Sequence, residues 1–372
     1  MSNFITEIKI GKVRHLENID IKLGNEKKHL ILTGKNGCGK TAVLEKLDSV
    51  LSVNYTQGYP IIEANGLGVK FYINDLSFSY AKDYIYTFFS TERGIKFHKP
   101  KTIKKINFTK IEEYKVKKLN QDFLQYIVNL KIEYLFAQLD NDEEESLKLD
   151  AWFNKFEIML KNIFNDNSFK LIFDRKNYNF WIERDNRERF DLNSLSAGYS
   201  AIIDIITELI LKIETTESKS FDCEGIVLID EVENHLHVEL QKNILPLLTN
   251  FFPNIQFIVT THSPFVLQSI ENSVVYDLER KESLSGEKLN KATYSDIVKN
   301  YFEVDSEFSE VLESDIKKYQ NLVKKFENKN LTIEGEKELL DLDIKLDKIA
   351  PMLSDDIYLR FKESQDRIQE NG

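Results

Sequence analysis

The sequence is poor in cysteine and has no long apolar run, and both absences narrow what the protein can be. It has two cysteines in 372 residues, Cys38 and Cys223, which is too few for a disulfide framework and is typical of a reducing compartment. No segment approaches the length needed to span a bilayer, and the first residues lack the basic and apolar regions of a leader. We therefore expect a cytoplasmic protein without a membrane partner.

The sequence also has no excess of positive charge. Its formal net charge is −11 at pH 7, which argues against a uniformly basic surface for nucleic acid. Hydrophobic residues make up 42% of the chain and charged residues 30%, a balance that is typical of a globular protein rather than a disordered one. A chain of this length can form one large α/β domain with an insertion, or two domains.

One glycine-rich motif, G-x-x-x-x-G-K-T at residues 34–41, lies between an apolar run and a segment with helical spacing. Glycine tolerates positive φ, so successive backbone N–H groups can turn toward one anion, and the following helix adds partial positive charge. The lysine can reach the β- and γ-phosphates of a nucleotide, and the threonine hydroxyl can bind Mg²⁺. The predicted nucleotide contacts are Asn36, Gly37, Gly39, Lys40 and Thr41.

Two alternating apolar stretches precede this loop and predict a pair of strands over residues 5–23, joined by a turn at 14–18. Such a hairpin would lie near the nucleotide. Arg14 or His15 could then stack on the adenine ring, and an ordinary solvated turn explains the pattern equally well.

Two apolar, β-branched runs farther along the chain end in polar side chains. Residues 225–229 lead into Asp230 and Glu231, and residues 256–259 lead into a cluster that contains His262. Such runs are typical of buried parallel strands, and ligands bind at the carboxyl ends of these strands. We expect Asp230 to hold Mg²⁺ and Glu231 to orient and deprotonate the attacking water. His262 is expected to hydrogen-bond the γ-phosphate or that water.

A Ser-x-Gly turn at residues 196–198 opens an apolar helix over 201–213. A turn of this kind offers a serine hydroxyl and free N–H groups to an anion, so Ser196 and Gly198 are further candidate ligands of the nucleotide. Taken alone, the turn is equally typical of an ordinary helix N-cap.

The stretch before this turn is harder to interpret. Short strand-like segments alternate in it with segments of helical spacing at 123–139 and 152–164, and no heptad run is long enough for a coiled-coil arm. Nine lysines lie between Lys96 and Lys118, interleaved with aromatic residues. They could contact nucleic acid, although lysine runs are usually solvated surface. The acidic residues at 140–145 predict an exposed loop.

The last part of the chain is highly charged, with apolar residues at helical spacing. An Asp-Leu-Asp at 341–343 mimics a metal-binding pair, but it lies in a helical segment, and we interpret it as structural. The sequence thus predicts four parts, which are the start of the core at 1–53, an α+β insertion at 54–191, the rest of the core at 192–280, and a helical region at 281–372.

Together the motifs resemble those of the ABC-type ATPases of the RecF, SMC and OLD group. The matching segments are Walker A at 34–41, the signature motif at 195–200, Walker B at 226–231 and the switch histidine, His262. Residues 230–237, with the sequence DEVENHLH, are most similar to the OLD-like branch, which includes ATPase subunits of the PARIS, Septu and retron anti-phage defence systems. Residues 86–93 are also similar to the strand and arginine that follow Walker A in that branch, although the resemblance assigns no role to Arg93. The resemblance implies an α/β fold: an ABC-type P-loop head with a mixed β-sheet, an α+β insertion and a helical C-terminal region.

In this family two heads enclose two ATP molecules. The resemblance therefore implies ATP and Mg²⁺ as cofactors and a homodimer in which Ser196 and Gly198 contact the nucleotide of the other head, with a higher oligomer left open. Asn234, His235 and His237 would then lie at the dimer seam. The family also has a Q-loop glutamine, for which Gln138 is the one candidate in this sequence.

The leading hypothesis is an ATPase that hydrolyses ATP to ADP and phosphate and acts as a sensor or scaffold for a separate, co-encoded effector, a nuclease, in anti-phage defence. We expect no nuclease activity of its own, because the metal-binding domain of OLD nucleases has no counterpart in the sequence. The alternative is a RecF-like repair ATPase whose ATP-bound dimer clamps DNA. An assembly module that binds ATP with negligible turnover is a third reading.

Overall fold

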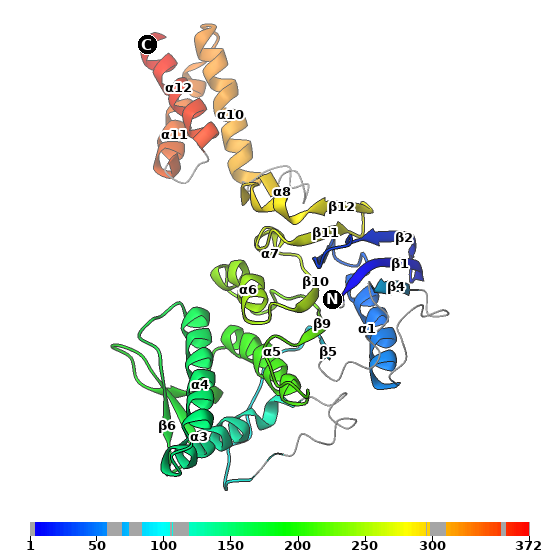
Figure 1. The fold of residues 1–372 in the computed structure, drawn as a ribbon. Coiled ribbons are helices and arrows are strands. Elements are labelled where there is room, and N and C mark those ends of the chain that lie inside the picture. The colour runs from blue at the N-terminus through cyan, green and yellow to red at the C-terminus, as the bar shows by residue number, and fades with distance from the viewer. Residues whose placement is uncertain are drawn as a thin grey trace. The chain divides into compact units, whose positions relative to one another are not determined.

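The computed structural model describes residues 4–57, 69–73, 84–104, 106, 119–294, 296–297, 310–350 and 355–371. The chain divides into two compact units, Met1–Tyr294 and Ser295–Gly372 (Figure 1). Each has an apolar core of its own. The finer division expected from the sequence, at residues 53, 191 and 280, stays a prediction.

A six-stranded sheet forms the centre of the first unit, in the order β12-β11-β3-β10-β9-β5. Its strands are β3 (His29–Thr33), β5 (Tyr84–Phe89), β9 (Glu224–Ile229), β10 (Ile255–Thr260), β11 (Ser273–Asp277) and β12 (Glu282–Ser285). Strands β11, β3, β10, β9 and β5 run parallel, and β12 pairs antiparallel with β11. Every residue of β3 and β10 is buried, as expected for parallel strands covered on both faces. The mixed sheet predicted from the sequence is therefore confirmed.

A smaller antiparallel sheet, in the order β2-β1-β4, covers one side of this core. It consists of β1 (Ile5–Val13), β2 (Leu16–Lys22) and β4 (Val69–Ile73). Helix α1 (Lys40–Gln57) contacts strands of both sheets, and the inward apolar residues of β1 and β2 join those of α1 and β3 in one cluster. The hairpin expected over residues 5–23 is thus present, and its turn at Arg14 has a positive φ of 54°.

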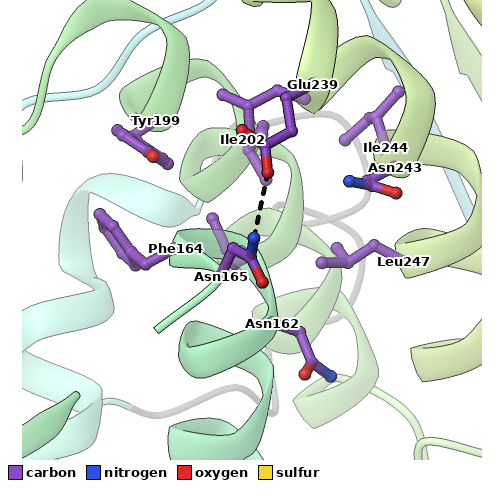
Figure 2. A pocket seen from close by; sticks show the side chains of 11 residues that line it. Asn162, Phe164, Asn165, Tyr199, Ile202, Glu239, Asn243, Ile244 and Leu247 are labelled. Carbon is purple, nitrogen blue, oxygen red and sulfur yellow. Dashed lines mark hydrogen bonds between the residues drawn. The ribbon is translucent and has the colours of Figure 1, made fainter. Parts of the chain in front are cut away.

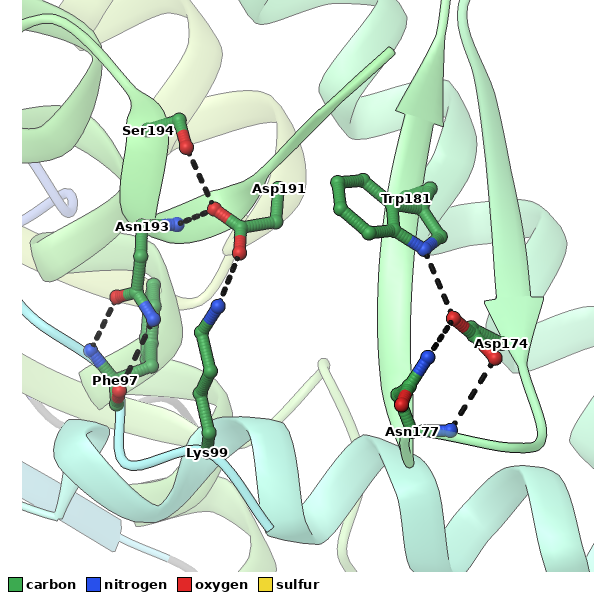
Figure 3. Close-up of polar contacts among 8 residues, drawn as sticks. All are labelled: Phe97, Lys99, Asp174, Asn177, Trp181, Asp191, Asn193 and Ser194. Atoms are coloured by element: carbon green, nitrogen blue, oxygen red, sulfur yellow. Dashed lines mark hydrogen bonds and ion pairs between the residues drawn. The ribbon is translucent and has the colours of Figure 1, made fainter.

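The segment between the two halves of the core forms an α+β lobe (Figure 1). It contains η2 (Asn120–Asp122), α3 (Phe123–Leu139), α4 (Glu143–Phe164), β6 (Lys170–Asp174), β7 (Asn179–Glu183), β8 (Phe190–Asp191) and η3 (Leu192–Ser194). Asp174 closes the β6–β7 hairpin by accepting hydrogen bonds from Asn177 and the Trp181 indole (Figure 3). These bonds, led by that from the Asn177 side chain, lower the pKa of Asp174 to about 2.

The acidic stretch expected to be a loop is partly helical. Residues Glu143, Glu144 and Glu145 form the first turn of α4, and Asp142 caps that helix by accepting a hydrogen bond from the Glu145 N–H at 3.1 Å. Carboxylates at a helix N-terminus are stabilised by the helix dipole. A run of acids can therefore begin a helix as well as form a solvated loop.

Among the described residues, four further helices complete the first unit around the sheet. They are α5 (Ala197–Glu214), α6 (Val238–Phe251), α7 (Pro264–Leu267) and α8 (Gly286–Asn290). Helix α5 is buried along most of its length and contacts both β5 and the lobe, so it connects the two parts of this unit.

The second unit contains α10 (Glu310–Glu327), α11 (Ile333–Ile349) and α12 (Asp355–Asn371). Tyr319, Leu342 and Phe361 belong to its apolar cluster. Asp343, in the Asp-Leu-Asp segment, accepts hydrogen bonds from the Tyr319 hydroxyl at 2.7 Å and from Gln365 at 3.0 Å. The segment thus has a packing role. No helix in the described part of the chain is long and apolar enough to cross a membrane.

Candidate active site

The loop of residues 34–39 lies between β3 and α1, and its glycines have the conformation that the motif predicts. Gly34, Gly37 and Gly39 have φ values of 135°, 83° and 100°. A Cβ on Gly39 would lie 2.9 Å from Leu16 Cδ1, and one on Gly34 would lie 2.8 Å from Cys38 Sγ. At Gly34 and Gly39 both the backbone conformation and the close neighbouring atom disfavour a side chain, and at Gly37, where space is open, the backbone conformation alone does so.

Lys40, the first residue of α1, closes the loop from within. Its Nζ donates hydrogen bonds to the carbonyl oxygens of Gly34 at 2.9 Å and Lys35 at 3.1 Å, and the residue is only 6% exposed. A phosphate at this helix N-terminus would offer the same ammonium group a charged acceptor. The turn between β1 and β2 lies beside the loop, because His15 Cε1 is 3.7 Å from the Cβ position of Gly39.

The candidate metal ligands meet where α1 begins and β9 ends. Thr41 Oγ1 donates a hydrogen bond to Asp230 Oδ1 at 3.2 Å, and Thr260 Oγ1 donates to the same oxygen at 2.5 Å. Asp230 is 2% exposed. A hydroxyl and a carboxylate are the hard oxygen ligands that Mg²⁺ takes from a protein when phosphates and waters complete its shell. The residues present therefore fit a magnesium ion bound together with a nucleotide.

Glu231 is the next residue, and its backbone is in the left-handed region with φ of 44°. Its N–H donates to Thr260 Oγ1 at 2.6 Å, and the Val232 N–H donates to the Thr260 carbonyl at 3.0 Å. Positive φ is uncommon for a residue with a side chain and occurs often where surrounding contacts enforce it at functional sites. Glu231 thus follows Asp230 directly at the carboxyl end of β9.

His262 follows β10, the strand next to β9. Its N–H donates to Glu233 Oε1 at 2.5 Å. Burial lowers the pKa of the His262 imidazole, the charge of Lys40 lowers it further, and three nearby carboxylates oppose both effects. The ring is therefore neutral at pH 7 and can either donate or accept a hydrogen bond.

Arg93 is the residue that analysis of the sequence did not assign to the site. It follows β5, and its guanidinium donates hydrogen bonds to the carbonyl oxygens of Ser90, Asp230 and Glu231. The residue is 8% exposed, and burial lowers its pKa against the opposing effect of the surrounding acids. Arg93 thus holds the turn that carries Asp230 and Glu231. The signal that could have identified it is the strand at 84–89, which pairs with β9 along its whole length.

Gln138, the candidate Q-loop residue, does not lie in this site. It lies on the lobe helix α3, is exposed, and donates a hydrogen bond to the Tyr134 hydroxyl at 2.8 Å. The structure therefore does not bring it to the loop at 34–41, and Arg93 occupies the connection from the core to the lobe.

The signature turn packs against the turn that follows Asp230. A Cβ on Gly198 would lie 2.7 Å from the His235 carbonyl oxygen, which requires glycine there. Ser196 is the N-cap residue of α5, but its side chain is exposed and makes no capping hydrogen bond. Asn234 Nδ2 donates to the Thr91 carbonyl at 3.0 Å. The signature turn and the turn after Walker B thus form one continuous surface.

Side chains of α5 bind the backbone that follows Arg93. The N–H groups of Gly94 and Ile95 donate to Asp204 Oδ2 at 3.0 Å and Ser200 Oγ at 3.1 Å. The two N–H groups of Leu119 and Asn120, farther along the chain, donate to Glu208 Oε2, which lies one turn beyond Asp204. Helix α5 therefore binds the backbone both just after Arg93 and at residues 119–120, where the lobe helices begin.

Two further contacts lie beside this link (Figure 3). The side-chain amide of Asn193 pairs with the backbone of Phe97 through two hydrogen bonds of 2.7 and 3.1 Å, and Lys99 pairs with Asp191 at 2.8 Å. Lys99 is one of the nine lysines considered for nucleic acid, and here it makes an ion pair. Five others, Lys105, Lys110, Lys115, Lys117 and Lys118, lie outside the described residues.

A hollow of about 160 Å³ lies on the other side of the signature turn, between the end of α4 and the helices α5 and α6 (Figure 2). Tyr199, in the first turn of α5, stacks on Phe164 with ring centroids 4.4 Å apart, and Asn165 Nδ2 donates to Glu239 Oε1 at 3.1 Å. The hollow is separate from the phosphate loop and shows that the signature helix also packs on the lobe.

The fold and the meeting of these motifs define the chain as an ABC-type P-loop ATPase. The family described as "AAA domain, putative AbiEii toxin, Type IV TA system" matches residues 30–268, more than half of the chain, and the chain belongs to this family. The resemblance to defence ATPases is thereby confirmed at the level of the family.

The names of individual relatives are consistent with this family. The chain is 27% identical over 320 residues to "Septu protein PtuA" of Bacillus mycoides (strain KBAB4), with 77% of this chain and 42% of the relative covered. It is 34% identical over 147 residues to "Retron Ec83 probable ATPase" of Escherichia coli, with 37% and 26% covered. The chain spans less than half of the length of either relative. A structure of an SMC head bound to the winged-helix domain of ScpA shares 13% identity and a TM-score of 0.41, over 77% of this chain and 99% of that one.

Proposed function

We propose that this protein binds ATP with Mg²⁺ and hydrolyses it to ADP and phosphate. The observation that carries the proposal is the contact between Thr41 and Asp230, at 3.2 Å, beside the buried ammonium of Lys40. These groups come from positions about 190 residues apart in the chain, and a hydroxyl, a carboxylate and an ammonium in this arrangement are what a magnesium–triphosphate complex requires.

The residues of the chain then have distinct roles. The loop N–H groups at Asn36, Gly37 and Gly39 and the ammonium of Lys40 would hold the phosphates. Thr41 and Asp230 would hold Mg²⁺, which supplies positive charge that neutralises the transferring phosphoryl group.

Two more side chains would act on the attacking water. Glu231 orients it and accepts its proton, and the neutral imidazole of His262 hydrogen-bonds the water or the γ-phosphate. Arg93 fixes the backbone from which Glu231 projects, so it is a positioning residue.

The active form in this proposal is a homodimer that encloses two ATP molecules. Two observations support this proposal: the side chain of Ser196 is exposed, and Gly198 packs closely against His235. The signature turn and the turn after Asp230 therefore share one surface. In the dimer this surface would face the nucleotide of the other head. The γ-phosphate would then bridge two chains, so dimer affinity would depend on the nucleotide state.

The proposed biological role is control of a separate, co-encoded effector, a nuclease, in anti-phage defence. The support is the family, whose description names a toxin system, and the names of the Septu and retron relatives. Since the chain spans only part of those relatives, the partner and the trigger belong to this proposal.

Phosphate release by the purified protein tests the enzymatic part. Lys40→Ala and Glu231→Gln are each expected to reduce kcat at least about a hundredfold, because they remove a phosphate ligand and the base. Lys46→Ala, on the same helix and half-buried, is the matched control. Normal turnover by Glu231→Gln would reject the assigned base, and normal turnover by both variants would reject the site.

Purification of Glu231→Gln from the native host with ATP and Mg²⁺ tests the role. A stoichiometric second protein that resists nuclease treatment is the expected result. Nucleic acid alone, lost at high salt, would contradict the effector role and support a DNA clamp.

A further inference from the structure

We propose that the tip of the α3–α4 hairpin is a docking surface for a basic amphipathic helix of a separate protein. The inference rests on the proposed function, because it specifies the chemistry of the partner that the ATPase controls. We use the name tip patch for the four residues Ile132, Leu135, Phe136 and Leu139 at the end of α3.

The tip patch is an apolar stripe that faces solvent. Its residues occupy positions i, i+3, i+4 and i+7 of a helix, so they lie on one face. Leu135 is 41% exposed, Phe136 59% and Leu139 75%. Leu147, in the second turn of α4, is 70% exposed. Apolar side chains scattered singly on a surface need no explanation, but a stripe of this kind marks an interaction site.

The patch is held in a defined shape. Residues Phe123, Ile127 and Val128 of the same helix are buried in the lobe, so its first half is anchored. The turn into α4 is closed by hydrogen bonds from the Asp140 N–H to the Phe136 carbonyl at 2.9 Å and from the Asp142 N–H to the Ala137 carbonyl at 2.8 Å. A partner would therefore meet a preformed helix face and would not have to order a loop.

The charge around the patch selects the partner. Five of the six residues from 140 to 145 are acidic, and Asp140, Asp142, Glu143 and Glu144 are exposed. These carboxylates repel the phosphates of a nucleic-acid backbone. They also oppose a second copy of this chain, whose net charge is −11. A protein surface with lysine or arginine beside its apolar residues matches both features of the tip.

The dimensions favour a helix as the partner. The patch extends over eight residues of α3, from 132 to 139, or about 10 Å along the axis, which equals two turns of a partner helix. Helices that dock on such faces insert apolar residues spaced at i, i+3 or i+4, and i+7. We therefore assign the site to a helix with that spacing and basic residues along its flanks.

The test uses a synthetic helical peptide with leucine at this spacing and lysine at the other positions, labelled for fluorescence anisotropy. The full-length protein is expected to bind it, and added salt should weaken binding through the acidic rim. The double variant Phe136→Ser/Leu139→Ser should bind at least about tenfold more weakly, since central apolar anchors carry most of the affinity. Ile158→Ser, on α4 and 53% exposed, is the matched control and should bind as the wild type does.

Several results would overturn the inference. Equal binding of the peptide by the wild type and the double variant would place the peptide elsewhere. Equal binding of a peptide with glutamate in place of lysine would remove the role of charge. Self-association of the wild type that the double variant loses would make the occupant a second copy, and duplex binding lost in the double variant would make it nucleic acid.

The assay runs without nucleotide, so it is independent of catalysis. The double variant is expected to release phosphate at the wild-type rate, because the tip patch lies in the lobe and not in the site. If Lys40→Ala had no effect on phosphate release, the ATPase proposal would fail while the peptide result would stand.

Discussion

Arg93 helps to hold the acidic turn after β9 in its conformation. The guanidinium of Arg93 donates to the backbone at Asp230 and Glu231, and its Nε is buried without a hydrogen-bond partner among the described residues. A guanidinium held in this way stabilises one backbone conformation, and a smaller side chain could not make the same contacts. The left-handed φ of Glu231 is the conformation that this contact supports.

Substitution of Arg93 should therefore affect kcat more than KM. Arg93→Lys keeps a positive charge, but its donors share one nitrogen and cannot reproduce the planar fork with which Nη1 and Nη2 of Arg93 reach separate carbonyl groups. We therefore expect kcat to fall about tenfold or more and KM for ATP to change less than about threefold. Steady-state phosphate release measures both constants. Arg175→Lys, an exposed arginine of the lobe, is the control. A change confined to KM would mean that Arg93 acts on binding.

Gly198 allows a second prediction at this scale. Alanine there would place its Cβ 2.7 Å from the backbone oxygen of His235, which cannot move as a side chain can. We expect Gly198→Ala to lower the free energy of unfolding by about 1–3 kcal/mol. Urea denaturation measures it, and Ala197→Ser, the exposed neighbour, should be nearly neutral. An unchanged unfolding midpoint for Gly198→Ala would show that the two turns can separate without cost.

Residues differ in how far the sequence alone could place them. Lys40 and Thr41 were predictable, because the chemistry of phosphate binding fixes their spacing within one short motif. Asp230 and Glu231 were predictable as a pair at the end of a buried strand. Arg93 was not, because its partners are 137 and 138 residues away and only the pairing of β5 with β9 brings them together.

At the level of elements, strand β3 is linked to β10 by a buried histidine. His29, at the start of β3, accepts a hydrogen bond from the Phe257 N–H at Nδ1, 3.0 Å away. Burial lowers the pKa of His29 from 6.5 to about 3. In the unfolded chain the ring takes up a proton near pH 6.5, but in the folded protein it stays neutral to much lower pH.

Acid should therefore destabilise the sheet through His29. The unfolded state binds the extra proton between pH 6.5 and about 3, so the contribution of His29 to stability is present above pH 6.5 and falls as the pH is lowered, by up to about 1.4 kcal/mol per pH unit. Urea unfolding at pH 6.5, 6.0 and 5.5 measures the slope. His29→Gln should flatten it and His98→Gln, an exposed histidine, should not. Equal slopes for wild type and His29→Gln would reject the assignment.

Elements were also predictable to different degrees. The strands of the core were evident from continuous apolar runs, and the α3 helix from its spacing. Helix α4 begins earlier than its apolar pattern suggested, because Asp142 and the following glutamates support a first turn with few apolar residues. Capping and dipole effects act there instead of burial.

For the whole molecule, the two units have separate apolar cores, and every assigned nucleotide ligand lies in the first. We expect ATP and Mg²⁺ added to Glu231→Gln to slow backbone hydrogen exchange at residues 34–41 and 230–235. Residues 310–371 should exchange at an unchanged rate. Mass spectrometry of the peptides obtained by proteolysis after exchange of the full-length protein measures this, with Lys40→Ala as the control that should show no protection. Slower exchange at residues 310–371 would indicate that nucleotide binding also affects the helical unit.

The backbone contacts of α5 have an evolutionary consequence. Ser200, Asp204 and Glu208 bind N–H groups of the lobe connection, and an N–H group is the same whatever side chain follows it. Mutations in the connection and beyond can therefore accumulate without loosening its attachment to the helix, provided that the three recognising side chains persist. Such an arrangement would let a lineage exchange the surface of its lobe while the ATPase core is inherited unchanged.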